Sequence, residues 1–313
     1  MPELSRKYLL VSPCRNEAEY MCKTLDSVLE QTVPPTKWLI IDDGSTDDTP
    51  TILAEYAEKY DWIEVVTKPD RGHRAVGPGV IEAFHYGLEH LDWQEYDFLC
   101  KLDLDLDLPS AYFEELMERM ENNPRIGSCS GKPFFIKNGK KISEKCGDEM
   151  SVGMTKFYRK DCFKEIGGFV RAVMWDAIDC HKSRQLGWIA CSWDDEQLRF
   201  EHLRPMGSSQ KGILSGRARH GYGQYYMGSN FFYFTATCVF RMAHPPYVIG
   251  GLATWWGYFH AALTGKGQQE DAELRAFIRA YQTRALFVGK AAATAEFVDR
   301  QTTVWDAREA KLA

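Results

Sequence analysis

The first half of the chain alternates two patterns of hydrophobic and polar positions. Short, nearly continuous apolar runs of strand length alternate with longer segments in which apolar residues recur at the spacing of an amphipathic helix. Strands that alternate with helices predict an α/β fold, in which a mostly parallel sheet is flanked by helices. The expected strands are residues 8–12, 38–41, 63–67 and 96–102, and the expected helices are residues 17–31, 49–60 and 76–91.

Polar residues follow three of these expected strands. Residues 15–17 come after the first strand, residues 42–43 after the second, and residues 103–105 after the fourth. In an open parallel sheet the carboxyl ends of the strands lie where ligands bind. We therefore expect these three clusters to form one site.

The composition changes from about residue 225. Aromatic and small residues dominate up to about residue 265, and a charged, helix-prone tail follows. We place a boundary near Gly228, with a first domain over residues 1–228 and a helical, aromatic-rich extension over residues 229–313.

Residues 247–263 are strongly apolar; they contain no Asp, Glu, Lys or Arg, and His260 is their only histidine. The segment is at the short limit for a membrane span. A spanning helix, interfacial helices and a buried core helix are three interpretations of it. Because clustered aromatic side chains favour the membrane–water interface, peripheral membrane contact is the interpretation we favour.

The overall charge and the cysteines limit the class of protein. The 313 residues carry a net charge of −6, which argues against nucleic acid as the main partner because phosphate binding needs a basic surface. The 9 cysteines show no paired spacing, so reduced thiols in the cytoplasm are expected. The first residues run directly into the first expected strand, and we expect no signal peptide.

Leucine and aspartate alternate between Lys101 and Asp107. In an extended chain, side chains two residues apart point to one face, so the alternation predicts two or three neighbouring carboxylates. Such carboxylates repel one another unless a cation lies between them, and their hard oxygen atoms suit Mg²⁺ or Mn²⁺. A solvated acidic loop is the alternative. The apolar strand before the cluster and the helical pattern after it favour a metal site, where the ion could bridge two phosphates of a ligand.

Four motifs follow one another along the chain. They are residues 12–17, residues 42–47, residues 102–105 followed by 108–113, and residues 167–169 followed by 175–176 and 186–188. Together they resemble the family 2 glycosyltransferases over roughly residues 8–230, and four spaced motifs agree by chance much less often than one. The resemblance implies the GT-A fold, a Rossmann-like, mostly parallel sheet flanked by helices. It also implies inverting transfer of a sugar from a nucleotide-diphosphate sugar.

The resemblance also implies roles for individual residues. Asp103, Asp105 and His202 would hold the metal, with Asp105 the more direct ligand, although a lone histidine is more often a packed or surface residue. Arg71 and Arg74 could contact the diphosphate or belong to a solvated basic loop. Residues 202–223, rich in Gly, Arg and His, resemble the loop that closes over the donor, and their arginines could contact a donor or an acceptor phosphate. The expected donor-binding residues are Pro13, Arg15, Glu17, Asp42, Asp43, Arg74, Asp103, Arg217 and Arg219.

Asp176 falls at the position of the family's catalytic carboxylate. The family more often has Glu-Asp here, whereas this chain has Trp175 before Asp176. As catalytic base, Asp176 would remove the proton from the attacking acceptor hydroxyl. Asp179 fits better as an acid near a helix N-terminus.

The expected partners follow from these assignments. The donor would be a UDP- or GDP-sugar, and an acceptor linked to a lipid would be reached at the inner face of the cell membrane. A nucleotidyltransferase is a weaker alternative, because the loop after the first strand lacks the glycines that such enzymes use. A catalytically inactive sugar- or lipid-binding scaffold is another alternative, against which Asp103, Asp105 and Asp176 argue.

Overall fold

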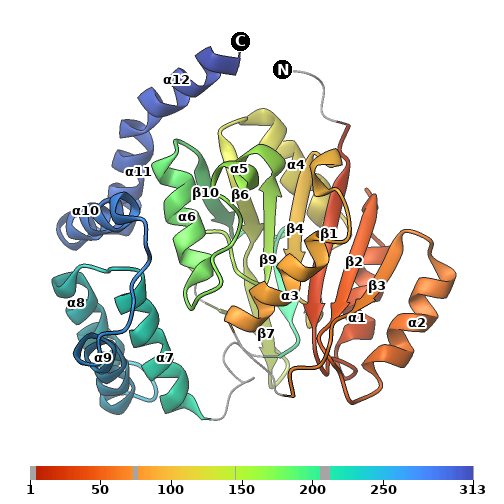
Figure 1. The fold of residues 1–313 in the computed structure, drawn as a ribbon, viewed down its shortest axis with the longest axis horizontal. Coiled ribbons are helices and arrows are strands. Elements are labelled where there is room, and N and C mark those ends of the chain that lie inside the picture. The colour runs from red at the N-terminus through yellow and green to blue at the C-terminus, as the bar shows by residue number, and fades with distance from the viewer. Residues whose placement is uncertain (1–4, 73–76, 145, 205–211, 313) are drawn as a thin grey trace. The chain divides into compact units, whose positions relative to one another are not determined.

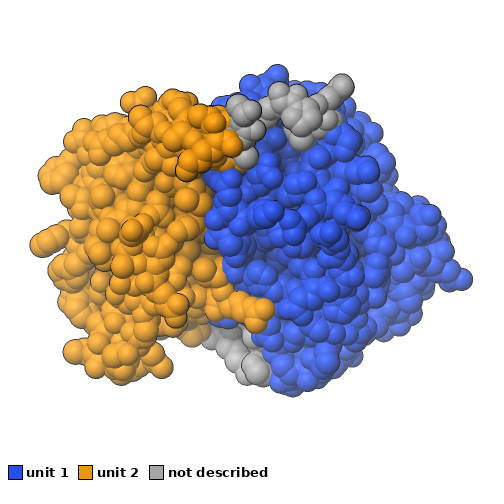
Figure 2. All heavy atoms as spheres, turned by 45° about the horizontal axis from the view of Figure 1, so that its top comes forward, with its two compact units in different colours: residues 1–169, 188–205 blue, residues 170–187, 206–313 orange. Residues whose placement is uncertain are grey.

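The computed structural model describes residues 5–72, 77–144, 146–204 and 212–312. The chain forms two compact units, each of which is described by itself (Figure 2). Unit 1 comprises Met1–Phe169 and Trp188–Pro205, and unit 2 comprises Val170–Gly187 and Met206–Ala313.

Unit 1 is built on a seven-stranded sheet (Figure 1). Its strands, in spatial order, are β10 (Ile189–Trp193), β6 (Ile126–Gly131), β9 (Thr155–Arg159), β4 (Phe98–Leu102), β1 (Tyr8–Cys14), β2 (Lys37–Asp42) and β3 (Ile63–Thr67). Only β9 runs antiparallel to its neighbours, so the mostly parallel sheet expected from the sequence is confirmed. A smaller sheet has the order β5 (Leu106–Asp107), β11 (Phe200–His202), β7 (Pro133–Lys137) and β8 (Lys140–Ser143).

Helices cover both faces of the larger sheet. They are α1 (Met21–Leu29), α2 (Thr49–Lys59), α3 (Pro78–Leu88), α4 (Tyr112–Asn122) and α5 (Lys160–Glu165), with a short 3₁₀ helix η1 (Trp93–Glu95). Leu10 and Ile40 point into a core shared with α1, α2 and α4. On the opposite face, Gly87 of α3 lies so close to Ile41 that an added Cβ would come within 2.6 Å of it. Successive side chains of a strand point to opposite faces of the sheet, and helices bury the apolar side chains on both faces, as expected for a parallel sheet.

Unit 2 is helical (Figure 1). Its helices are α6 (Trp175–Gln185), α7 (Ile213–Tyr226), α8 (Phe231–Met242), α9 (Val248–Leu263), α10 (Ala272–Val288), α11 (Lys290–Arg300) and α12 (Thr302–Leu312). Lys182 of α6 pairs with Asp271 before α10, and the His181 ring lies 5.1 Å from the ring of Tyr281. Because α6 packs on α10, residues 170–187 group with the C-terminal helices, and the compact units are divided differently from the boundary placed near Gly228.

The apolar segment 247–263 corresponds to α9, which has 16 residues. At 1.5 Å per residue this helix is about 24 Å long, whereas the hydrocarbon core of a bilayer is about 30 Å thick. Among the described residues, no helix combines the length and the apolar character that a membrane crossing requires.

Candidate functional site

The carboxyl ends of β1, β2 and β4 lie at one edge of the larger sheet. Cys14, the last residue of β1, is paired with Asp42, the last residue of β2. On its other side β1 pairs in parallel with β4, which ends at Leu102. The polar residues that follow these three strands are thus brought to the same edge, as the strand pattern predicted.

The loops after β1 and β2 are joined by hydrogen bonds. Asn16 accepts a hydrogen bond from the backbone N–H of Thr46 at 2.8 Å, and its own N–H donates to Ser45 Oγ at 2.9 Å. The Ser45 N–H in turn donates to Asp42 Oδ1 at 2.9 Å, which closes the turn after β2. Pro13 is the half-buried penultimate residue of β1. This network fixes the shape of the edge before any ligand binds.

Basic side chains surround Asp43. Its carboxylate lies 2.7 Å from Arg71 Nη2 and 3.5 Å from Lys68 Nζ, while its carbonyl oxygen accepts a hydrogen bond from Arg15. Arg15 also pairs with Asp70 at 2.6 Å. The Asp43 carboxylate can accept hydrogen bonds from N–H or hydroxyl groups, and the basic side chains around it can donate hydrogen bonds to phosphate. Arg74 lies outside the described residues.

Arg204 connects two carboxylates that lie far apart in the sequence. It pairs with Glu17, and its Nε lies 3.2 Å from Asp105 Oδ2. Glu17 is buried, and its backbone N–H donates to Thr49 Oγ1 at 2.9 Å. Arg204 reaches this position because β11 pairs with β5, after which the Leu203 N–H donates to the carbonyl oxygen of Asp105 at 2.9 Å.

His202 lies between two carboxylates. Its Nδ1 is 2.7 Å from Glu144 Oε2, and its Nε2 is 3.7 Å from Asp105 Oδ2. Burial acts to lower the pKa of His202, but the contacts with Asp105 and Glu144 outweigh burial and raise it to about 9. Burial likewise acts to raise the pKa of Asp105, but His202 and Arg204 hold it below its usual range.

The three aspartates of the alternating segment have separate cationic neighbours. Asp103 pairs with the buried Lys101, Asp105 with Arg204 and His202, and Asp107 with Lys23 at 3.0 Å. The strand is interrupted at residues 103–105, between β4 and β5. The chain is not continuously extended there. Asp103 lies close enough to Asp105 to interact with it electrostatically, whereas Asp107 pairs with Lys23.

The donor set around Asp105 has the ligand chemistry of a divalent cation site. Asp105 offers a carboxylate and His202 directs Nε2 toward it, while Glu144 orients the ring from the Nδ1 side, as carboxylates commonly do behind metal-bound histidines. Within the described ranges, however, no three His, Cys, Asp or Glu side chains converge closely enough to hold a metal ion by themselves. A bound ion would therefore need further oxygen ligands from water or substrate.

The remaining expected residues belong to unit 2. Asp176 is the second residue of α6, in the first turn, where the helix N–H groups favour a negative charge. Arg217 and Arg219 lie on α7, where Arg217 Nη2 is 3.3 Å from the carbonyl oxygen of Pro245. Asp179 is buried in α6. Their roles remain predictions.

Sequence reasoning did not single out Glu144, Lys101, Lys68 or Arg204 as site residues. Glu144 follows β8 and gives no local sign of its function, because its partner His202 is supplied by a distant strand. Arg204 had a local signal, since it lies two residues after His202 in the stretch recognised as rich in Gly, Arg and His.

The family model for glycosyl transferase family 2 matches residues 10–171, which include the strand-end clusters and the Asp103–Asp105 segment. The chain belongs to this family. Poly-beta-1,6-N-acetyl-D-glucosamine synthase of Staphylococcus epidermidis is 30% identical over 121 residues, which are 38% of this chain and 27% of that protein. The same enzyme of Staphylococcus aureus (strain COL) is 29% identical over 123 residues, again 38% and 27% of the two chains. The alignments thus cover about a quarter of the length of these curated relatives.

Solved glycosyltransferases share the fold. Mannosyltransferase PcManGT from Pyrobaculum calidifontis, in complex with GDP-Man and Mn²⁺, matches with a TM-score of 0.52 and 17% identity over 96% of this chain and 87% of its own. S. aureus TarS 1–349 in complex with UDP-GlcNAc matches with a TM-score of 0.52 and 15% identity over 97% and 92%. GalNAc-T7 with UDP, GalNAc and Mn²⁺ matches with a TM-score of 0.54 and 15% identity over 91% and 58%. The GT-A fold expected for this chain is confirmed.

Proposed function

We propose that this family 2 member is an inverting, metal-dependent glycosyltransferase that moves a sugar from a UDP- or GDP-sugar to a lipid-linked acceptor, at the inner face of the cell membrane. The product would enter a cell-surface polysaccharide or glycolipid. The observation that carries the proposal is the arrangement of Asp43 and Asp105, each with basic partners, after strands that end at the same edge of the sheet; His202 is one of the partners of Asp105. Nucleotide-binding α/β folds bind their ligands at that edge.

Donor binding would use the residues that the loops hold in place. Asp42 and Asp43 would accept hydrogen bonds from the base and ribose, beside Pro13 and Glu17. Arg15, held by Asp70 and the Asp43 carbonyl, would turn its guanidinium toward the donor. Asp103 would contact the ribose or the metal, and Arg74 and Arg217 would contact phosphate.

The metal, Mg²⁺ or Mn²⁺, would be held by Asp105 and His202 with Asp103 nearby. When bound, it would neutralise charge on the leaving diphosphate. The protein's own contribution is to orient the ligands: Glu144 fixes the His202 ring, and the Leu203 N–H holds the backbone of Asp105. Solved structures of the same fold that contain Mn²⁺ with GDP-Man or UDP support the use of a divalent metal.

Asp176 would act as the catalytic base. It lies in the first turn of α6, where the free N–H groups of the helix favour a negative charge. Inversion requires attack from the side opposite the diphosphate, so the base must meet the acceptor and need not touch the donor phosphates.

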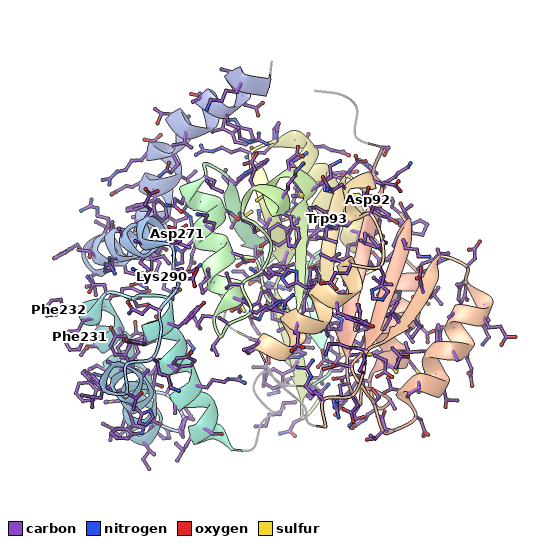
Figure 3. The ribbon with its side chains drawn as sticks, in the orientation of Figure 1. Asp92, Trp93, Phe231, Phe232, Asp271 and Lys290 are labelled. Carbon is purple, nitrogen blue, oxygen red and sulfur yellow. The ribbon has the colours of Figure 1, made fainter. Side chains whose placement is uncertain are left out.

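Peripheral membrane contact is supported by the exposed apolar side chains of α8 and α9. Phe232 is 72% exposed and Phe240 68%, and Figure 3 shows Phe231 and Phe232 projecting from the start of α8. Aromatic side chains at such positions insert favourably into the headgroup region of a bilayer. A lipid-linked acceptor is consistent with this surface.

Thermal stabilisation by nucleotides tests the donor and metal assignments together. UDP, GDP, CMP and dTDP would each be added with and without Mn²⁺ to the wild type, Asp105→Asn and the control Asp107→Asn, whose carboxylate pairs with Lys23 instead. A ligand present at 100 times its dissociation constant stabilises the native state by about 2.7 kcal/mol. We expect UDP or GDP to stabilise the wild type and the control in a metal-dependent way, but not Asp105→Asn. If no nucleotide stabilises the wild type, the proposal is wrong and the inactive scaffold is favoured.

A transfer assay tests the base. Asp176→Asn should reduce turnover by about 10²–10⁴-fold and leave donor binding intact, because only proton removal is lost. Asp161→Asn, which changes an acid in the first turn of α5, is the matched control. Equal turnover of Asp176→Asn and wild type would exclude Asp176 as the base.

A further inference from the structure

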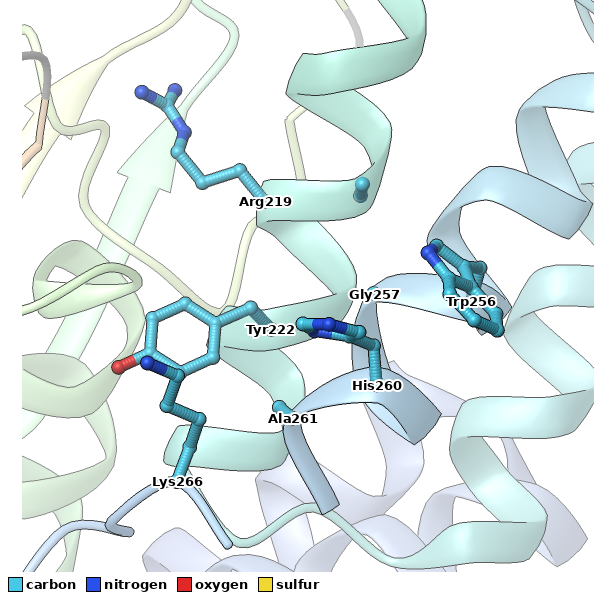
Figure 4. A pocket seen from close by; sticks show the side chains of 8 residues that line it. Arg219, Tyr222, Trp256, Gly257, His260, Ala261 and Lys266 are labelled. Atoms are coloured by element: carbon cyan, nitrogen blue, oxygen red, sulfur yellow. The ribbon is translucent and has the colours of Figure 1, made fainter. Parts of the chain in front are cut away.

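A cavity of about 350 Å³ lies between α7 and α9 within unit 2 (Figure 4). Its polar and aromatic lining comes from Arg219, Tyr222, Trp256, His260 and Lys266. In Figure 4, the Lys266 side chain extends to the Tyr222 ring, while Arg219 and Trp256 lie at different ends of the group. This volume is at the lower end of the range for ligand sites, and it suits a headgroup-sized molecule.

Glycines allow the two helices to approach each other beside the cavity. A Cβ added to Gly221 would lie 1.8 Å from the carbonyl oxygen of Thr254, and one added to Gly257 would lie 1.9 Å from that of Ala218. Backbone contact of this kind fixes the two helices against each other. The longer side chains that flank the contact are therefore held around the cavity.

The surroundings of the cavity are basic. Residues 202–269 contain no Asp or Glu, although the whole chain carries a net charge of −6. Burial first, and then the positive charges of Arg241, Arg217 and Arg219, lower the pKa of His220 to about 3, so each of these arginines is close enough to His220 to act on it electrostatically. Positive charge gathered without acidic residues in the same segment attracts an anion.

The outer face of α9 continues from the cavity as an apolar surface. The helix buries its small residues, among them Gly250, Thr254 and Ala261, and exposes its large ones. A surface helix of a water-soluble protein instead buries its large apolar side chains and exposes polar ones. Trp256, which is 60% exposed, both lines the cavity and belongs to this surface. The exposed large apolar residues of α9 are Val248, Ile249, Leu252, Trp255, Trp256 and Leu263.

We propose that the cavity between α7 and α9 binds the phosphate group of an anionic lipid, with Arg219 and Lys266 as its cationic contacts and Trp256 at the boundary with the acyl chains. The site deepens the proposed function, on whose membrane contact it rests, since a lipid-linked acceptor carries such a phosphate. The proposal also gives Arg219 a contact with an acceptor phosphate; the sequence had left open whether this arginine contacts a donor or an acceptor phosphate.

Binding to vesicles tests the site. The full chain would be mixed with phosphatidylcholine vesicles, with and without phosphatidylglycerol, and bound protein measured by flotation. The double variant Arg219→Gln/Lys266→Gln is matched by Arg300→Gln/Lys311→Gln, which removes the same two charges from α11 and α12. Each basic side chain at an anionic surface strengthens binding about fivefold, so the cavity variant should bind anionic vesicles about 25-fold more weakly than wild type. The matched variant should bind like wild type, and equal losses in the two double variants would overturn the site.

Two further measurements separate the sources of phosphate and guard against misfolding. Lys266→Gln alone changes an exposed side chain, and a loss of about fivefold is expected without a change in melting temperature. Glycerol phosphate should stabilise the wild type but not the double cavity variant if the site also accepts a free phosphate ester. If the wild type binds neither kind of vesicle, the proposed membrane contact is wrong. If glycerol phosphate also fails to stabilise the wild type, the cavity site is overturned as well. Nucleotide-dependent stabilisation would still report on the donor site separately.

Discussion

Replacing Glu144 by Gln tests whether the two carboxylates control the charge of His202. The substitution removes the charge 2.7 Å from Nδ1 and preserves the size of the side chain. The difference between the ordinary pKa of 6.5 and the value of about 9 corresponds to about 3 kcal/mol in favour of the protonated ring in the folded protein. Because Asp105 and Glu144 share this effect, Glu144→Gln should lower the pKa of His202 by about one unit or more.

Nuclear magnetic resonance of the imidazole groups measures this pKa directly, in the presence of a chelator. His202→Gln identifies the signal by its loss, and His90→Gln, which changes an exposed histidine, should leave it in place. A midpoint near 9 in the wild type that falls in Glu144→Gln is the expected result. A wild-type midpoint at or below 6.5, or one that Glu144→Gln leaves unchanged, would refute the electrostatic reasoning.

The same pKa predicts how stability depends on pH. The folded pKa of His202 lies above its unfolded value, so the stabilisation is complete below about pH 6.5 and is lost as the pH rises through about 9. Between about pH 6 and pH 10, the free energy of unfolding of the wild type should fall by up to about 3 kcal/mol relative to His202→Gln. Metal affinity should change in the opposite direction, because only the neutral imidazole is a ligand, and it should rise as the pH approaches 9.

Two other substitutions test contacts within single units. Arg204→Gln should lower the free energy of unfolding by about 3–5 kcal/mol in chelator, because it leaves Glu17 and Asp105 without their shared cation, and Mn²⁺ should restore part of the loss. Denaturant titrations with and without Mn²⁺ measure both effects. Equal stability of the variant and the wild type in chelator would contradict the contact. Gly257→Ala should destabilise by about 1–3 kcal/mol, since the new Cβ meets the backbone of α7, whereas Gly267→Ala, which meets nothing within 4 Å, should be nearly neutral; a neutral Gly257→Ala would show that α7 and α9 are not in backbone contact.

Local patterns predicted the sheet and the place of its polar edge. The apolar runs of β1 to β4 and the polar residues that end them are read from neighbouring positions, and the parallel register then brings Cys14 beside Asp42. This is why the strand-end clusters could be located from the sequence. The family motifs added expected roles for individual residues, which the pattern alone does not assign and which stay predictions.

The charge pairing of the site could not be predicted in the same way. The contacts of Asp105 depend on β11 lying against β5, a pairing between segments about a hundred residues apart. The alternation of leucine and aspartate suggested an extended chain, but the backbone turns at residues 103–105 and separates Asp107 from its neighbours. Side-chain partners supplied by distant strands leave no periodic signal in either segment.

Each unit is built from two separate segments of the chain, and this limits how the protein can be truncated or recombined with relatives. Residues 170–187, from the middle of the sequence, belong to unit 2. The chain returns to unit 1 at Trp188, where β10 forms the edge strand of the larger sheet. A truncation at residue 228 would strip α10 from α6, the helix that begins with the Asp176 turn. A chimera that exchanges unit 2 between relatives must therefore transplant residues 170–187 together with the C-terminal helices, although the two segments are separate in the sequence.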